Sequence, residues 1–161
     1  MDKNAGKTEL AIWLAAFIDA DGMVGIHKQP NNGNGQLCPR IVISTACEKT
    51  RDFLGDAFAA LEIGHYITHR RGQKAGWMDT WVIVIAGMKR CKKTIETLLP
   101  YFVTKEEEAR LVLQFIEERL SYPMRRGYTP GQLAIVERIK DTKLNRNFSS
   151  YAGPTKVKLV Q

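Results

Sequence analysis

The chain has 161 residues, which is enough for one domain with a substantial hydrophobic core, and 44% of them are hydrophobic. Its formal net charge of +7 favours a polyanionic partner, and the lack of an apolar run of roughly 18 residues argues against a membrane span. The polar N-terminus does not resemble a secretory signal, and Cys38, Cys47 and Cys91 lack zinc-ligand spacing. We therefore expect free thiols in a reducing intracellular compartment, the cytoplasm of a prokaryote or an organelle.

Basic and acidic residues occupy different parts of the chain. No acid occurs in residues 22–47, 63–78 or 142–161, and each of these stretches contains lysine or arginine. The acids gather instead in Glu106–Glu108 and Glu117–Glu118. A solvated basic surface explains any one of these stretches, but three together favour a face that binds nucleic acid.

The first predicted helix runs from about Thr8, as its N-cap, to Ala20. The spacing of its apolar residues directs Leu14, Phe17 and Ile18 toward a core. A second face carries only small side chains, those of Ala15, Ala16 and Ala20. Asp21 lies where this helix must stop, Gly22 provides the exit, and Asp19 caps no evident helix. A small-residue face that ends in a carboxylate suggests a dimer axis that brings two acids to one site. The alternative is a buried alanine-rich helix with a polar last turn.

The remaining segments predict two hairpins and four more helices. In chain order these are strands 23–29 and 40–45 around the turn 30–35, helix 50–61, strands 66–71 and 77–85, and helices 88–99, 105–120 and 130–140. Alternation puts Val24, Ile26 and Ile41 on one face of the first hairpin. We predict one α+β domain over residues 1–161, with a core at about 8–140 and a basic tail over 141–161. A four-stranded antiparallel sheet carries helices on one side, and no internal repeat is present.

Residues 14–22 read LAAFIDADG, which resembles the LAGLIDADG motif of homing endonucleases. The differences are mainly alanines in place of both internal glycines. The resemblance extends to the whole αββαββα order over residues 8–140, and it fits the single-motif class that works as a homodimer. It places the dimer interface on the first helix, at Trp13, Ala16, Phe17 and Ala20.

The resemblance also implies a Mg²⁺ site. In the family the second acid of the motif binds the metal, which corresponds to Asp21, and the preceding residue, here Ala20, contributes its backbone carbonyl. Asp19 is then a second-shell group or a helix-end partner, with a plain surface acid as the alternative. Lys105 aligns with a family lysine near the metals, and the alternative for it is an ion pair with Glu108.

Two further catalytic positions follow from the same resemblance. Glu48 or Cys47 occupies the place where the family often has a water-positioning glutamine, and we favour Glu48. Arg71 resembles a family arginine near the scissile phosphates.

The sheet is the expected DNA-reading surface, because β-strands fit the major groove of a duplex. The expected DNA contacts are outward strand positions and the basic residues beside them: Gly25, His27, Gln29, Arg40, Ser44, His69, Arg70, Arg71, Lys74 and Thr80. A shift of one residue in a strand would move its set to the other face. The tips at residues 31–36 and 73–76, together with the basic tail, are expected to contact phosphate.

These inferences predict a homodimeric, Mg²⁺-dependent endonuclease that cuts double-stranded DNA at a long, partly palindromic site. The resemblance also predicts that its gene lies in an intron. One alternative is an RNA-binding maturase that assists splicing of its own intron. The other is a DNA-binding regulator that has lost cleavage, and the presence of Asp21 and Lys105 argues against it.

Overall fold

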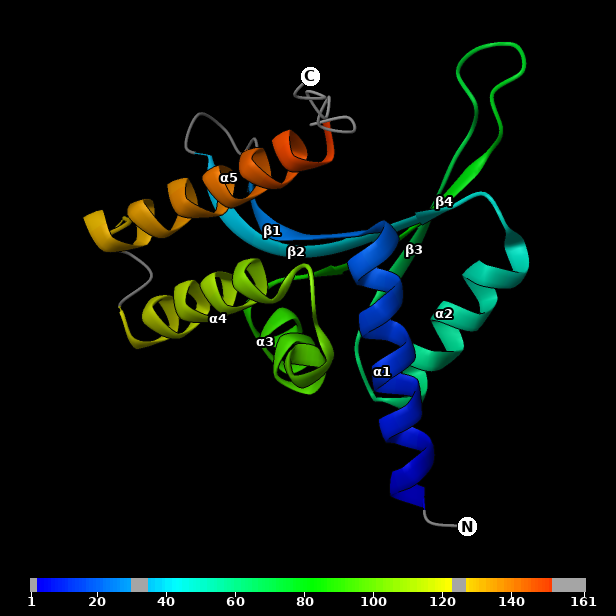
Figure 1. The fold of residues 1–161 in the computed structure, drawn as a ribbon, viewed down its shortest axis with the longest axis horizontal. Coiled ribbons are helices and arrows are strands. Elements are labelled where there is room, and N and C mark those ends of the chain that lie inside the picture. Colours follow the sequence, from blue (N-terminus) through cyan, green and yellow to red (C-terminus); the bar gives the residue numbers. More distant parts are fainter. Residues whose placement is uncertain (1–2, 30–34, 123–126, 152–161) are drawn as a thin grey trace, which may run out of the picture.

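Within the residues that the structure describes, a four-stranded antiparallel sheet and five α-helices make up the fold, which is the predicted α+β arrangement (Figure 1). The computed structural model describes residues 3–29, 35–122 and 127–151. In chain order the elements are α1 (Lys3–Asp21), β1 (Gly22–Gln29), β2 (Gln36–Thr45), α2 (Glu48–Ala60), β3 (Tyr66–Arg70), β4 (Thr80–Ala86), α3 (Met88–Leu98), the 3₁₀ turn η1 (Leu99–Tyr101), α4 (Glu106–Ser121) and α5 (Pro130–Tyr151). The predicted αββαββα order is therefore confirmed.

The strands lie in the order β1-β2-β4-β3, so the two hairpins meet at the centre of the sheet through β2 and β4. Ile41 lies opposite Val24 on one side and Ile85 on the other, and all three are 1% exposed. Because side chains alternate between faces along a strand, this register defines the core face of the sheet. The predicted faces of the first hairpin are confirmed.

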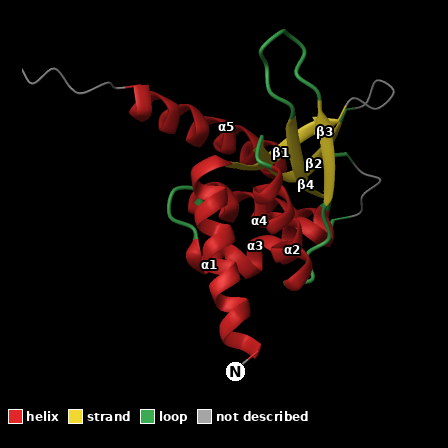
Figure 2. Cartoon of the chain, turned by 90° about the vertical axis from the view of Figure 1, so that its right-hand side faces the viewer, coloured by secondary structure: helices red, strands yellow, loops and turns green. Residues whose placement is uncertain are grey.

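Helices α1 to α4 cover the core face, and Figure 2 shows them gathered on one side of the strands. Leu14 and Ile18 of α1, Phe58 of α2, Ile95 of α3 and Phe115 of α4 are all 0% exposed. They pack into one hydrophobic core with the sheet. In the part of the chain that the structure describes, no helix has the length and apolar character needed to cross a membrane.

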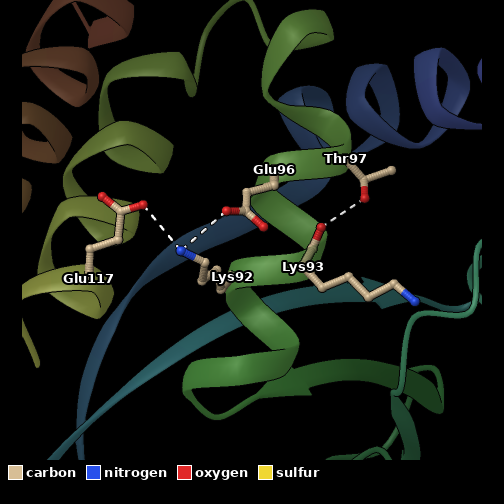
Figure 3. Close-up of polar contacts among 5 residues, drawn as sticks. All are labelled: Lys92, Lys93, Glu96, Thr97 and Glu117. Atoms are coloured by element: carbon tan, nitrogen blue, oxygen red, sulfur yellow. Dashed lines mark hydrogen bonds and ion pairs between the residues drawn. The ribbon is translucent and has the colours of Figure 1, made fainter. Parts of the chain in front are cut away.

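On the surface, Lys92 links α3 to α4 (Figure 3). Its Nζ lies 3.2 Å from Glu117 Oε1 and 3.3 Å from Glu96 Oε1, and these contacts raise the pKa of Lys92, with Glu117 as the largest cause. One turn further along α3, the hydroxyl of Thr97 donates to the carbonyl oxygen of Lys93 at 2.8 Å. Exposed ion pairs of this kind add little to stability, so the core, not this link, holds the helices together.

Several predicted boundaries are wrong. Helix α1 begins at Lys3, so Thr8 lies inside the helix and is not its N-cap. Strand β2 begins at Gln36, four residues before the predicted start, and it passes through Pro39. The Pro39 carbonyl accepts a hydrogen bond from Gly87 N–H at 3.2 Å, just past Ala86, the last paired residue of β4. Pro39 lies just beyond the last β2–β4 pair, Arg40 with Ala86, so its lack of an N–H removes no hydrogen bond from that ladder.

The other boundary differences concern α2, β4 and α5. Helix α2 begins at Glu48, two residues earlier than predicted, and β4 begins at Thr80 because residues 71–79 form a loop. Helix α5 continues to Tyr151, through half of the stretch predicted as a tail without periodicity. The sequence has no glycine or proline from residue 132 to residue 152, so helix propensity continues where amphipathic spacing fades.

Candidate functional site

The carboxylate of Asp19, near the end of α1, holds the segment that leads into α4. Its Oδ2 accepts a hydrogen bond from Val103 N–H at 2.6 Å, and its Oδ1 accepts one from Lys105 N–H at 2.9 Å. The hydroxyl of Thr104 also donates to Oδ1 at 3.1 Å. Backbone N–H groups at the start of a helix have no partner within the helix, so an outside acceptor stabilises them. Asp19 is therefore the helix-end partner, and the expectation that it caps nothing is wrong.

Lys105 lies at the N-cap position of α4 and is 7% exposed. Its ammonium donates to the backbone carbonyl of Asp19. A buried ammonium requires acceptors, and the carbonyls at the C-terminal end of a helix also provide a partial negative charge. The structure therefore brings Lys105 to the end of α1 through Asp19. Glu108 lies one turn further along α4 and is fully buried.

Asp21 is the last residue of α1, and both Asp21 and Ala20 are exposed. The chain then turns directly into β1 at Gly22. A Cβ at Gly22 would lie 2.8 Å from Ile18 Cα, so only glycine fits at this junction. Close packing of this turn against Ile18 explains why a glycine follows Asp21. The Asp21 carboxylate lies at the surface.

This acidic end suits a hard divalent cation that keeps most of its water ligands. Mg²⁺ takes oxygen ligands and is often bound through one or two carboxylates, and Asp21 and the Ala20 carbonyl are both oxygen donors. Within residues 3–29, 35–122 and 127–151, no group of three or more His, Cys, Asp or Glu side chains could enclose a metal.

The start of α2 presents a second group of polar side chains at the end of the sheet. Glu48 and the N-cap residue Cys47 are both exposed, and hydrogen bonds from Thr50 are the main cause of a lowered pKa of the Cys47 thiol. Arg51 lies over the ring of Trp81 at 4.8 Å from its centroid. Sequence reasoning missed Arg51. Had the helix been predicted to start at Glu48, Arg51 would have been expected one turn later, on the same helix face as Glu48.

Arg71 lies outside the strands, in the loop that projects from the end of the β3–β4 hairpin (Figure 1). Asp79 organises this loop: its Oδ1 accepts a hydrogen bond from Gly72 N–H at 3.0 Å, and its Oδ2 lies 3.0 Å from His69 Nε2. The pKa of Asp79 is lowered first by the Gly72 hydrogen bond, then by His69 and Arg71. The structure thus places Arg71 and Lys74 on the projecting loop, apart from the junction of α1 and α4.

The sheet face away from α1 to α4, here called the outer face, carries most of the predicted DNA contacts. Strand alternation and register place the following residues on it: Gly25, His27, Gln29, Arg40, Ser44, Arg70 and Thr80. His69 is a correction, because it pairs with Trp81 on the core face, whereas Arg70 pairs with Thr80. Directly opposed residues share a face, so His69 and Thr80 cannot both point outward.

Lys143 of α5 reaches over the outer face at β1. A Cβ at Gly25 would lie 2.5 Å from Lys143 Nζ, and Gly25 is buried. Burial, followed by the charges of Lys143 and Arg40, lowers the pKa of His27. In the structure His27 Nε2 and Arg40 Nε are buried without a hydrogen-bond partner among the described residues. Two cationic side chains, Lys143 and Arg40, therefore lie close to His27 on this part of the outer face.

The face of α1 turned away from the core is apolar and exposed. Trp13 is 38% exposed, stacks on Phe17 at 5.2 Å and meets the ring of Phe53 edge-on at 4.3 Å. Ala16 is exposed on the same helix, whereas Ala15 is fully buried, so the prediction that Ala15 belongs to the bare face is wrong. An exposed apolar stripe of this kind is typical of an interaction surface.

Comparison with known proteins gives matches among solved structures. No family model matches the sequence, and no curated protein does. The homing endonuclease I-CvuI, solved in complex with its target, shares 20% identity over 86% of this chain and 84% of that chain, with a TM-score of 0.68. The LAGLIDADG homing endonuclease I-GzeII, in complex with a DNA target, shares 15% over 82% of this chain and 43% of that chain, with a TM-score of 0.60.

A third match is the homing endonuclease I-TnaI, with 17% identity over 84% of this chain and 96% of that chain and a TM-score of 0.54. Identities this low establish the fold rather than the activity. The chain has the fold of the LAGLIDADG homing endonucleases, as the motif in residues 14–22 predicted.

Proposed function

We propose that this chain is a Mg²⁺-dependent endonuclease that cuts double-stranded DNA at a specific site as a homodimer. The observation that carries the proposal is the junction at which the buried Lys105 ammonium meets the end of α1, beside the exposed Asp21. A protein that only binds DNA needs neither group in this place. The I-CvuI and I-GzeII structures hold DNA targets, and one I-CvuI structure was obtained with Mg and uncleaved DNA, which supports the same class of substrate and metal here.

In this proposal Asp21 and the carbonyl of Ala20 hold Mg²⁺, which when bound activates water and offsets negative charge on the phosphate. Lys105 then presents a positive charge that is already desolvated, and it can stabilise the charge that develops on the scissile phosphate. Glu48, exposed at the start of α2, is proposed to orient the attacking water. Arg71 is proposed to bind backbone phosphate from its loop, as a DNA contact.

The proposed homodimer follows from the presence of one acidic helix end in each chain. A duplex has two strands to cut, and a two-fold axis beside α1 would bring together two copies of Asp21. Trp13 and Ala16 are exposed along α1, as such an interface requires, and Phe17 and Ala20 are proposed to extend it. The matched region covers 84% of I-CvuI but only 43% of I-GzeII, so the larger chain has room for a second copy of the fold.

The outer face is proposed to read the DNA, and a dimer would read two half-sites of a long, partly palindromic target. The net charge of +7 and the cationic region around Lys143 favour a polyanion on this face. By the same proposal the gene lies in an intron, whose spread requires cleavage of an intronless copy. A reducing compartment, in a prokaryote or an organelle, belongs to the proposal.

Cleavage of a randomised duplex DNA library in the presence of Mg²⁺ tests the proposal. We expect cuts at one family of related sites and none with EDTA. Asp21→Asn should abolish cleavage and leave DNA affinity intact or higher, because it removes the metal ligand and relieves repulsion between carboxylate and phosphate. Asp56→Asn, which changes an exposed acid on α2, is the matched control and should cut at the wild-type rate.

Two results would contradict the proposal. Cleavage by Asp21→Asn at the wild-type rate would remove Asp21 from the mechanism. Failure to cut any duplex, combined with tight binding of structured intron RNA, would favour an RNA-binding maturase.

A further inference from the structure

We infer that Asp19 is a positioning residue that sets the cleavage rate by holding Lys105 in place, without contacting DNA or metal itself. This inference rests on the proposed function, because it concerns how the proposed catalytic lysine is held. It assigns separate tasks to the two acids of the motif, with Asp21 facing the substrate and Asp19 facing the protein.

The oxygens of Asp19 are already engaged by the segment before α4. Oδ1 accepts hydrogen bonds from Lys105 N–H and the Thr104 hydroxyl, and Oδ2 accepts a short one from Val103 N–H. Hydrogen bonds to an ionised carboxylate are about twice as strong as neutral ones. A carboxylate that satisfies this many protein donors is poorly placed to bind a metal, whereas Asp21 is exposed.

Lys105 is held at two points by this one residue. Its N–H donates to the Asp19 carboxylate at 2.9 Å, and its ammonium donates to the Asp19 backbone carbonyl. The backbone contact fixes where the lysine side chain begins, and the second contact fixes where it ends. Loss of the carboxylate contacts would therefore release the lysine backbone, and the ammonium would lose its fixed position relative to Asp21.

The Thr104 hydroxyl adds to these contacts between Asp19 and the segment before α4. It lies 3.1 Å from the carboxylate and 3.3 Å from the carbonyl oxygen of Asp19. These contacts join residues 84 to 86 positions apart in the chain, so they fix tertiary structure rather than a local turn. Asp19 thus connects the end of α1 that carries the proposed metal ligands to the segment that supplies Lys105.

A double-mutant cycle between Asp19→Asn and Lys105→Met tests the inference, with single-turnover cleavage measured at saturating DNA and Mg²⁺. We expect Asp19→Asn to slow cleavage at least tenfold while its DNA dissociation constant stays within about threefold. The double variant should be no slower than Lys105→Met alone, because a positioning residue has no effect once the positioned group is gone. Asp56→Asn serves as the surface-acid control.

Amide hydrogen exchange supplies a readout that does not depend on activity. Asp19→Asn should speed exchange at Val103 and Lys105 and leave the amides of the central strand β4 protected. If Asp19→Asn does not fold, Thr104→Val, which removes one donor to the same carboxylate, should give a smaller loss of rate with the same dependence on Lys105.

The outcomes separate this inference from the proposed function. A wild-type rate in Asp19→Asn together with a slow Lys105→Met would overturn the inference and leave the proposed function standing. Additive losses in the double variant would also overturn it, because Asp19 would then act independently of Lys105. A wild-type rate in Lys105→Met would remove the lysine from the proposed mechanism and the inference with it.

Discussion

Two lysines, Lys105 and Lys143, occupy positions where a positive charge meets an unfavourable environment. Lys105 is buried, yet its ammonium meets the carbonyl of Asp19 at the negative end of α1. Lys143 reaches over Gly25 toward His27 and Arg40, which places like charges together. In the proposed function, DNA phosphate would bring negative charge to this cluster.

His27 should report this cluster through its protonation. Its folded pKa lies below the ordinary 6.5, so below pH 6.5 the unfolded chain binds more protons and stability decreases as the pH falls. Lys143→Met should raise the pKa of His27 toward 6.5, because it removes one of the two repelling charges. Titration of the imidazole signal by NMR measures this shift.

The matched control is Lys140→Met, which removes an exposed lysine that pairs with Glu137 on the same helix. It should leave His27 unchanged. An unaltered His27 pKa in Lys143→Met would mean that Lys143 does not lie over β1 in solution.

At the level of single residues, the sequence predicted the acids but not their partners. The apolar spacing of residues 14–18 and Gly22 located the end of α1, and Asp21 is exposed there. The partners of Asp19 could not be predicted, because Val103 and Lys105 are 84 and 86 residues away and no local pattern connects them with it. Lys105 was predicted as a site residue from the resemblance to the homing endonuclease family, not from the pattern of residues in the helix that it precedes.

At the level of elements, periodicity predicted the order of helices and strands, whereas strand register and loop length remained open. The second hairpin shows why: its loop spans residues 71–79, and the pairing of Arg70 with Thr80 turns His69 to the core face. The start of β4 cannot be read from Trp77 and Met78, which look like strand residues but are 62% and 71% exposed in the loop. Pairing partners, not local propensity, set such boundaries.

The junction of α1 and β1 provides a test at this level. Gly22→Ala should lower the free energy of unfolding by about 1–3 kcal/mol, since the added Cβ would lie 2.8 Å from Ile18 Cα. Gly6→Ala is the matched control, because nothing lies within 4 Å of a Cβ there and alanine favours helix by up to about 1 kcal/mol. Denaturant unfolding measures the free energy of unfolding of both variants. Equal values for Gly22→Ala and the wild type would contradict the prediction, because the backbone of the turn would then accommodate a Cβ at no cost.

At the level of the whole molecule, different parts of α1 contact the core, face the solvent and hold the segment before α4. Leu14, Ala15 and Ile18 are 0% exposed in the core, while Trp13 and Ala16 lie on the exposed side. Near its C-terminal end Asp19 contacts the segment before α4. One helix therefore joins the core, the proposed dimer axis and the proposed metal site.

The proposed dimer should fail when its close helix contact is filled. Ala16→Leu should weaken association by about 1–3 kcal/mol through overpacking and leave the monomer folded, because Ala16 is exposed in one chain. Sedimentation equilibrium measures the dimer, and circular dichroism checks the fold. Ala134→Leu makes the same change at an exposed position of α5 and should leave association unchanged. A wild-type protein that sediments as a monomer while cutting both strands would contradict the homodimer.

The hydrogen bonds from Lys105 to Asp19 span 86 residues, and both hairpins lie between them. During synthesis at about 5–20 residues per second, roughly 4 to 17 seconds separate the appearance of the acidic helix end from that of the lysine. Throughout that interval the growing chain contains the motif but no lysine to complete the junction. By the proposed mechanism, cutting therefore becomes possible only after residue 105 has been made, when both hairpins are already present. Incomplete chains that end before residue 105 lack the lysine that the proposed mechanism requires for cutting.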